Sequence, residues 1–306
     1  MSQGNIIRNG RVAYFVRALR LPFISASVLP FVFGSMVSFP HVKAFPFTLG
    51  LAVVVFTHLS ANLINDYADS KYGADWQDLR FYGFFGGSKL IQEQIFSQRF
   101  YAKMSLLFFL CSVLCAALLT IYLRTPVVPI CYGICMFLAW AYSYKPLLLS
   151  YRALGEVVIF ITFGPALVMG GYFIQTGIFP SVNSFLLSAP MGLLVAAILF
   201  ANEVPDYASD MKAGKHTLVA LTGPAKAYMG YYALVFFVFF FILLNIAVGN
   251  LGAFSFFSLA CILFALRAGH ILKVHYNDKL RLIESSRLTI MLQTTVSLVL
   301  ILAVIV

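Results

Sequence analysis

Residues 46–69 read PFTLGLAVVVFTHLSANLINDYAD, an apolar run that ends in a cluster of amides and carboxylates. A helix needs roughly 20 mainly apolar residues to cross the hydrocarbon core of a bilayer, and this segment has that length. It therefore predicts a transmembrane helix that carries charged side chains at one end. Charged groups at membrane depth are costly, which makes these side chains candidates for function.

The same hydropathy recurs along the chain and indicates the class of protein. We predict nine spans, at about residues 22–40, 46–66, 104–123, 127–144, 154–176, 184–204, 227–248, 251–268 and 288–306. Over the whole chain 61% of the residues are hydrophobic and 10% are charged, whereas a soluble domain has about 25% charged residues. The sequence predicts an all-α polytopic membrane bundle. It excludes a soluble enzyme, a disordered protein and a nucleic-acid-binding module.

The distribution of charge predicts the orientation of the bundle. The net charge is +10, and apart from Lys43 and Arg124 every Lys and Arg precedes the first span, follows an even-numbered one or, as Arg267 does, lies at the end of one. Cytoplasmic segments collect Lys and Arg, so we expect a cytoplasmic N-terminus and a C-terminus outside, in a bacterial inner membrane. We also expect no removable signal peptide, because residues 1–20 lack an apolar stretch with a cleavage site. All eleven acidic residues lie on the cytoplasmic face as well.

Two spans end in the same polar triplet, one Asn followed by two Asp at spacings of three or four residues, which share one helix face. The triplets are Asn62, Asp66 and Asp69, and Asn202, Asp206 and Asp210. Carboxylates this close repel one another unless a cation lies between them. Hard oxygen ligands suit Mg²⁺, which takes one or two carboxylates together with waters and substrate phosphates. The six residues are therefore predicted Mg²⁺ ligands around a diphosphate, with the four Asp residues as the catalytic groups.

Basic and aromatic residues near these triplets complete the predicted diphosphate site. Those assigned to substrate binding are Arg20, Arg80, Lys145, Arg152, Lys212, Lys215 and Tyr142. Arg and Lys beside metal-bound phosphate stabilise a leaving diphosphate as negative charge develops on it. The same cations also fit simple anchoring of the cytoplasmic face.

Other interpretations of the carboxylates stay open at this stage. They also fit helix-end Asp residues solvated at the interface, or the ion ligands of a divalent-cation or proton-coupled transporter. A transporter usually places its ionisable residues near the bilayer midplane, whereas these lie at helix ends and in links. A purely structural membrane protein gives no reason for two matching triplets.

The triplets belong to a longer set of motifs that resembles the UbiA-type intramembrane aromatic prenyltransferases. The set also includes Arg17 to Pro22, Tyr142-Ser143, Gly155-Glu156 and Lys212 to Leu218. The resemblance covers most of the chain as one domain, residues 1–306, with two Asp-motif halves of about 1–125 and 126–306. The Gly73-x-Asp75 variant and the sequence from Leu149 to Glu156 are most similar to the 1,4-dihydroxy-2-naphthoate branch, which makes menaquinone precursors.

The resemblance implies nine helices around a central cavity that the two Asp motifs cap. It implies a Mg²⁺-dependent reaction in which a polyprenyl diphosphate ionises and its allylic cation is attacked by an aromatic acid. The expected acceptor is 1,4-dihydroxy-2-naphthoate, and the alternative is 4-hydroxybenzoate or another aromatic compound. The isoprenyl channel would open towards membrane lipid, and no nucleic acid partner is expected. Aromatic faces can stabilise the allylic cation, and the tyrosines near the motifs are Tyr67, Tyr142, Tyr144 and Tyr207.

Four further features are given structural interpretations or only weak functional ones. The five Cys residues are expected to be small buried hydrophobic side chains. His58 lies one turn before Asn62 and is expected to form a hydrogen bond within the bundle. The segment Gly86-Gly87-Ser88 fits either a weak phosphate-binding turn or a lid, and Gly164-Pro165 predicts a kink or a close helix contact.

Overall fold

The computed structural model describes residues 3–73, 76 and 78–306, so Asp75 of the first motif lies outside the described residues. The helices are α1 (Gln3–Ala18), α2 (Ser25–Met36), α3 (Ala44–Tyr72), α4 (Gln98–Leu123), α5 (Val127–Ser143), α6 (Gly155–Phe163), α7 (Pro165–Thr176), α8 (Val182–Lys212), α9 (Leu218–Thr222), α10 (Ala227–Ala247), α11 (Ile262–Val274) and α12 (Lys279–Ile305). Within the described ranges the extended structure is limited to an isolated bridge between Arg152 and His216. The predicted all-α class is therefore confirmed.

Seven helical segments of the described chain are long and apolar enough to cross a membrane. In this count α6 and α7 form one segment, and α11 is joined to the 3₁₀ helix Ala253–Cys261 that precedes it. A bent pair, Val12–Ala18 with Leu21–Met36, raises the number to eight at most, and α5 is shorter, with 17 residues. The protein is thus a multi-pass membrane protein, but the predicted number of nine spans is not confirmed.

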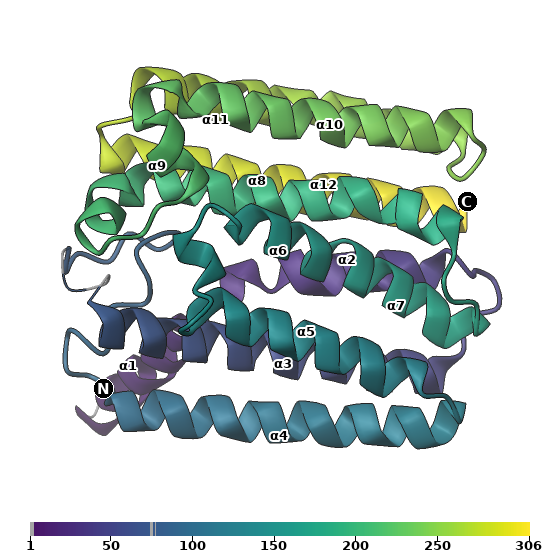
Figure 1. The fold of residues 1–306 in the computed structure, drawn as a ribbon, viewed down its shortest axis with the longest axis horizontal. Helices are drawn as coiled ribbons and strands as arrows, with labels where there is room; N and C mark the ends of the chain where they lie inside the picture. The colour runs from purple at the N-terminus through teal and green to yellow at the C-terminus, as the bar shows by residue number, and fades with distance from the viewer. Residues whose placement is uncertain (1–2, 74–75, 77) are drawn as a thin grey trace.

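The long helices run side by side, so that segments distant in the sequence end together (Figure 1). α10 and α11 form one outer layer, α8 and α12 lie beneath it, and α4 forms the opposite side. The links that follow α3, α5 and α8 gather at the same end of the bundle as the N-terminus, whereas the C-terminus lies at the other end. This arrangement brings both Asp motifs to one end.

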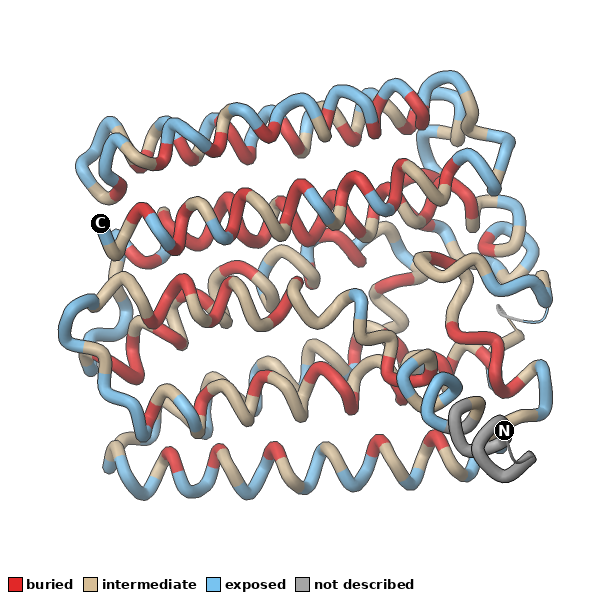
Figure 2. Tube along the Cα trace, turned by 180° about the vertical axis from the view of Figure 1, so that it is seen from behind, coloured by how far each residue is buried: buried red, intermediate tan, exposed pale blue. Residues whose placement is uncertain are grey.

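Burial is greatest in the layer that contains α8 and α12, while α4 exposes apolar side chains along its outer face (Figure 2). Close helix crossings depend on small residues, as is common between membrane helices. A Cβ atom at Gly34 of α2 would lie 2.1 Å from the carbonyl oxygen of Val168 in α7. α2 and α7 therefore pack backbone against backbone on one side of the bundle.

The predicted kink at Gly164-Pro165 is confirmed. α6 ends at Phe163 and α7 begins at Pro165, and Gly164 between them has φ −94° and ψ −93°. A Cβ atom at Gly164 would lie 2.9 Å from the Cα of Gly192 in α8. The break thus lets the α6–α7 segment bend while it stays in contact with the buried helix α8.

Candidate functional site

A cavity of about 920 Å³ lies between α2, α3, α4, α5, α6, α7 and α8. Its lining is mainly apolar, but amides and carboxylates line the end at which α3 and α8 finish. We call this end the polar mouth and define it by Asn65, Asp69, Asn202, Asp206 and Asp210. The two predicted motifs therefore face one chamber.

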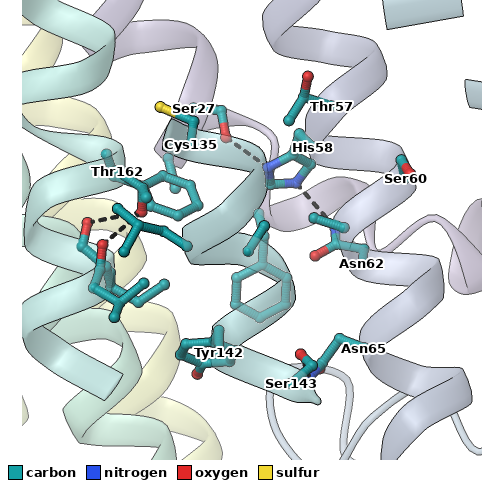
Figure 3. Close-up of a pocket in the computed structure, with 18 of the residues that line it drawn as sticks. Ser27, Thr57, His58, Ser60, Asn62, Asn65, Cys135, Tyr142, Ser143 and Thr162 are labelled. Atoms are coloured by element: carbon teal, nitrogen blue, oxygen red, sulfur yellow. Dashed lines mark hydrogen bonds between the residues drawn. The ribbon is translucent and has the colours of Figure 1, made fainter. Parts of the chain in front are cut away.

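Asn65 and Asp69 are the residues of α3 at the polar mouth. The Nδ2 atom of Asn65 donates to the hydroxyl of Ser143 at 3.4 Å, which directs an amide of α3 towards the end of α5 (Figure 3). Asn65 is not among the residues predicted from the sequence, although the sequence contains a signal for it. Its spacing of four residues to Asp69 equals the spacing of Asn202 to Asp206 in the second motif.

Asp66 lies behind the polar mouth and is not among the residues that line the cavity. It is 3% exposed, and both of its carboxylate oxygens have partners. Oδ1 lies 3.5 Å from the guanidinium of Arg20, and Oδ2 accepts a hydrogen bond from the backbone N–H of Ser88 at 3.1 Å. Asp66 therefore holds a basic side chain and a loop beside the cavity.

The second motif presents buried oxygens with few partners in the described chain. Asn202 Oδ1 is buried and accepts no hydrogen bond from the described residues, and Asp210 Oδ2 is buried beside a single cation. Lys215 Nζ lies 3.3 Å from Asp210 Oδ2 and forms an ion pair with it. Buried oxygens of this kind fit a cation ligand set.

A loop connects the two motifs directly. The backbone N–H of Gly86 donates to Asp206 Oδ2 at 3.0 Å, just as Ser88 N–H donates to Asp66. Gly86 and Gly87 both have φ +73°, a backbone conformation that glycine adopts without strain. The hydroxyl of Ser88 lies 2.6 Å from that of Tyr101, which anchors the loop on α4. The segment predicted as a turn or a lid thus lies on both Asp motifs.

The basic residues assigned to substrate binding divide into two groups. Arg20, Arg80 and Lys215 line the cavity, as does Lys89, which is buried. Those at the surface, outside the set of lining residues, are Lys145, Arg152 and Lys212. The guanidinium of Arg152 donates to the carbonyl of Pro146 at 3.0 Å instead. The structure therefore brings only part of the predicted basic set to the cavity.

Lys215 is the cation most surrounded by acidic groups. Burial alone would lower the pKa of its ammonium, but Asp210, Asp69 and Glu203 raise the pKa well above its ordinary value. Glu203 is itself buried and interacts with the buried carboxyl group of Glu156 in α6. Lys215 is therefore held firmly in the charged form.

The tyrosines near the motifs also fall into two groups, those that line the cavity and those that do not. Tyr142 and Tyr144 line the cavity, whereas Tyr67 and Tyr207 are not among its lining residues. Burial raises the pKa of Tyr144 to about 12, so its phenol stays neutral at physiological pH. Two aromatic side chains of the α5 end are thus available to a reacting group.

The fit of Mg²⁺ depends on what completes its coordination. Among the described residues, no three His, Cys, Asp or Glu side chains come together closely enough to enclose a metal ion. Mg²⁺ usually binds one or two carboxylates and fills its other positions with waters and substrate phosphates. The facing oxygens of the polar mouth fit that open mode of binding and not a closed protein cage.

Most of the chain matches a known protein family. The UbiA prenyltransferase family profile matches residues 27–291. The chain belongs to this family. Its membership confirms the predicted class of enzyme, a prenyltransferase.

Two groups of relatives are similar to this UbiA-family chain. UbiA prenyltransferase domain-containing protein 1 of Gallus gallus is 31% identical over 231 residues, which cover 74% of this chain and 67% of that protein. The Homo sapiens protein of the same name is 32% identical over 235 residues, with 74% and 66% covered. 1,4-Dihydroxy-2-naphthoate octaprenyltransferase of Bacillus subtilis is 29% identical over 206 residues, with 65% and 63% covered. The matches thus span about two thirds of each relative, and they do not establish the naphthoate branch.

Solved structures agree in fold. A UbiA homolog from Aeropyrum pernix has a TM-score of 0.71 at 19% identity, with 93% of this chain and 98% of that chain covered. A UbiA homolog from Archaeoglobus fulgidus, bound to DMAPP and Mg²⁺, has a TM-score of 0.63 at 17% identity, with 92% and 98% covered. The helical bundle is therefore the fold of these UbiA homologs.

Proposed function

We propose that the protein transfers an isoprenyl group from a polyprenyl diphosphate to an aromatic acceptor in the presence of Mg²⁺. The observation that carries the proposal is the polar mouth, where amides and carboxylates of α3 and α8 face one largely apolar chamber. The Archaeoglobus fulgidus homolog bound to DMAPP and Mg²⁺ supports it. So does a second structure of that homolog with GPP and Mg²⁺.

The proposed cation ligands are the cavity-facing oxygens of both motifs. Asp69, Asp206 and Asp210 supply the carboxylates, and Asn65 and Asn202 supply amide oxygens. Bound Mg²⁺ supplies positive charge that holds the diphosphate and offsets the charge developing on it. Asp66 was also predicted as a ligand. It does not line the cavity, and its two oxygens contact Arg20 and Ser88.

The basic side chains bind and orient the diphosphate. Lys215 pairs with Asp210 of α8 and Arg20 pairs with Asp66 of α3, so each Asp motif has one basic side chain beside it. As the allylic C–O bond breaks, its electron pair leaves with the diphosphate, where these cations stabilise it. Arg80 lies on the link between α3 and α4 and adds charge at the entrance.

The apolar chamber protects the rest of the reaction. A ring carbon of the acceptor forms a C–C bond with the allylic carbon and then passes its proton to the released diphosphate, which restores the aromatic ring. The chamber excludes water, which would otherwise capture the allylic cation. The rings of Tyr142 and Tyr144 lie beside the mouth and can stabilise the cation through their π-faces.

We infer that the acceptor is 1,4-dihydroxy-2-naphthoate and that the product enters quinone biosynthesis. The Bacillus subtilis relative named for that acceptor supports this choice. The alternative is 4-hydroxybenzoate or another aromatic acid. The asymmetry of Lys and Arg supports a cytoplasmic active site and N-terminus and an external C-terminus. The location that we propose is a bacterial inner membrane.

The direct test combines purified protein with Mg²⁺, a polyprenyl diphosphate and each candidate acid, and detects prenylated product by mass. We expect product with 1,4-dihydroxy-2-naphthoate and its loss in Asp206→Ala. Exposed Lys212→Met serves as a matched surface control. The proposal fails if no acceptor gives product and Asp69→Ala and Asp206→Ala leave Mg²⁺-dependent diphosphate binding intact.

A further inference from the structure

A chain of hydrogen bonds lies deeper in the cavity than the polar mouth. His58 of α3 has Nδ1 2.6 Å from the hydroxyl of Ser27 in α2 and Nε2 3.0 Å from Asn62 Nδ2 (Figure 3). All three residues line the cavity. The diphosphate site described above makes no use of this chain.

The contacts determine how the Asn62 amide is turned. Its Nδ2 atom lies 3.2 Å from the carbonyl oxygen of Leu19 and also contacts His58 Nε2. A carbonyl oxygen only accepts hydrogen bonds, so the amide must present its NH₂ group on this side. His58 Nε2 then accepts from Asn62, and the ring proton lies on Nδ1, where it is donated to Ser27.

The remaining atom, Asn62 Oδ1, is directed into the cavity (Figure 3). None of the described residues donates a hydrogen bond to this oxygen. Asn62 lies seven residues before Asp69, which is about 10 Å along the helix, and helical side chains tilt towards the N-terminus. The oxygen is therefore carried away from the polar mouth and into the apolar chamber.

We propose that Asn62 Oδ1 binds a ring hydroxyl of the aromatic acceptor and that His58 is the positioning residue that holds this oxygen in place. The proposal rests on the proposed function and assigns Asn62 to the acceptor in place of the metal. An amide oxygen attracts a hydroxyl and repels a carboxylate, so it selects the hydroxylated edge of the ring. Phe163 stands edge-on to His58, with ring centroids 6.5 Å apart, and gives the acceptor an aromatic neighbour.

Binding of two probes isolates this hydrogen bond without any transfer reaction. 1-Naphthol carries one ring hydroxyl, and in 1-methoxynaphthalene that donor is replaced by a methyl ether. Equilibrium dialysis against the full-length protein in detergent with Mg²⁺ gives the Kd of each. We expect wild-type protein to bind 1-naphthol about tenfold more tightly, because the ether leaves a buried oxygen unpaired. In Asn62→Leu this ratio falls to about one.

A matched pair of variants tests His58. Glutamine places its amide where the imidazole Nε2 lies and can still accept from Asn62, whereas asparagine reaches only the position of Nδ1. We expect His58→Gln to keep the tenfold ratio and His58→Asn to lose it, at similar thermal stability. In transfer assays Asn62→Leu should raise KM for the acceptor and leave KM for the diphosphate unchanged.

Each contrary result has a distinct meaning. The proposal is overturned if wild-type protein does not prefer 1-naphthol, or if Asn62→Leu keeps the preference. Loss of the ratio in both His58 variants, or in neither, removes the positioning role. Failure of the proposed function is a separate result, because it shows as absent prenyl transfer while the binding preference is measured independently.

Discussion

Replacement of Lys215 by methionine distinguishes the effect of this cation on Mg²⁺ binding from its effect on diphosphate binding. Methionine keeps much of the length of the side chain and removes its ammonium group. The Lys215 Nζ atom lies 3.3 Å from Asp210 Oδ2, with side-chain exposures of 17% and 8%. The variant therefore leaves a buried carboxylate without its cation.

The size of the effect follows from that distance. At an effective dielectric constant of about 20, two unit charges 3.3 Å apart attract with about 5 kcal/mol. Part of this attraction is offset by the cost of burying both charges, so removal of one partner costs about 3 kcal/mol. We expect the metal-free variant to melt at least about 6 °C lower than the wild type.

The affinities of the variant for Mg²⁺ and for the diphosphate should then change in opposite directions. Mg²⁺ no longer competes with an ammonium group for the carboxylates, so it binds Lys215→Met more tightly and restores much of the lost stability. The diphosphate loses a charge-assisted hydrogen bond, so its Kd rises by about tenfold or more. Thermal unfolding with and without Mg²⁺ and calorimetry with pyrophosphate measure both effects. Exposed Lys212→Met is the control, and weaker binding of both ligands to Lys215→Met would refute the reasoning.

Three further predictions test other parts of the molecule. Asp69→Asn should raise the Mg²⁺ concentration for half-maximal activity at least tenfold. Asp66→Asn should leave that concentration within about threefold and instead raise KM for the diphosphate, because the contact with Arg20 is lost. The reverse pattern would place Asp66 among the ligands. Gly34→Ala pushes a methyl group against the backbone of α7 and should destabilise the protein by about 1–3 kcal/mol, whereas Gly170→Ala, with open space around it, should be neutral in the same melting experiment. Burial raises the pKa of Asp78, but hydrogen bonds from Lys279 and the Arg80 backbone outweigh it and leave the pKa below its ordinary value of 3.8. The stabilisation by Asp78 is therefore full above that value and is lost as the pH falls through the lowered pKa, so Lys279→Met should speed amide exchange in residues 78–88 at neutral pH but match the wild type in acid.

The helical class and the end of the bundle that carries the site follow from local sequence. Apolar runs near 20 residues predict membrane helices whatever surrounds them. The kink at Gly164 is equally local, because Pro165 cannot continue the hydrogen bonding of the preceding turn. The number of spans is less local. The 17 residues of α5 and the bent segment before α3 are near the minimum length of a membrane span. Whether such a segment crosses the membrane depends on its packing against other helices.

The sequence predicts those site residues whose placement depends on helix periodicity alone. It does not predict those whose placement depends on tertiary contacts. Helical spacing put Asn62, Asp66 and Asp69 on one face, but that face is broad. The loop at residues 86–88 covers Asp66, while Asn65 on the neighbouring face points into the cavity. No local pattern shows that a loop 22 residues further on will donate to Asp66. The basic residues were over-assigned for a similar reason, since charge at a membrane face serves anchoring as well as binding.

The contacts around the Asp residues show how an acidic mouth can accept an anion. Asp66 pairs with Arg20 and accepts a hydrogen bond from a backbone N–H, Asp206 accepts one from another N–H, and Asp210 pairs with Lys215. All of these donors are also suited to phosphate oxygens, because ammonium, guanidinium and backbone N–H groups are the usual diphosphate ligands. When cations occupy the carboxylates, these donors become available to the phosphate oxygens of the substrate. The same groups therefore contact the carboxylates when no cation is bound and contact the diphosphate when one is, which makes cation binding and diphosphate binding cooperative.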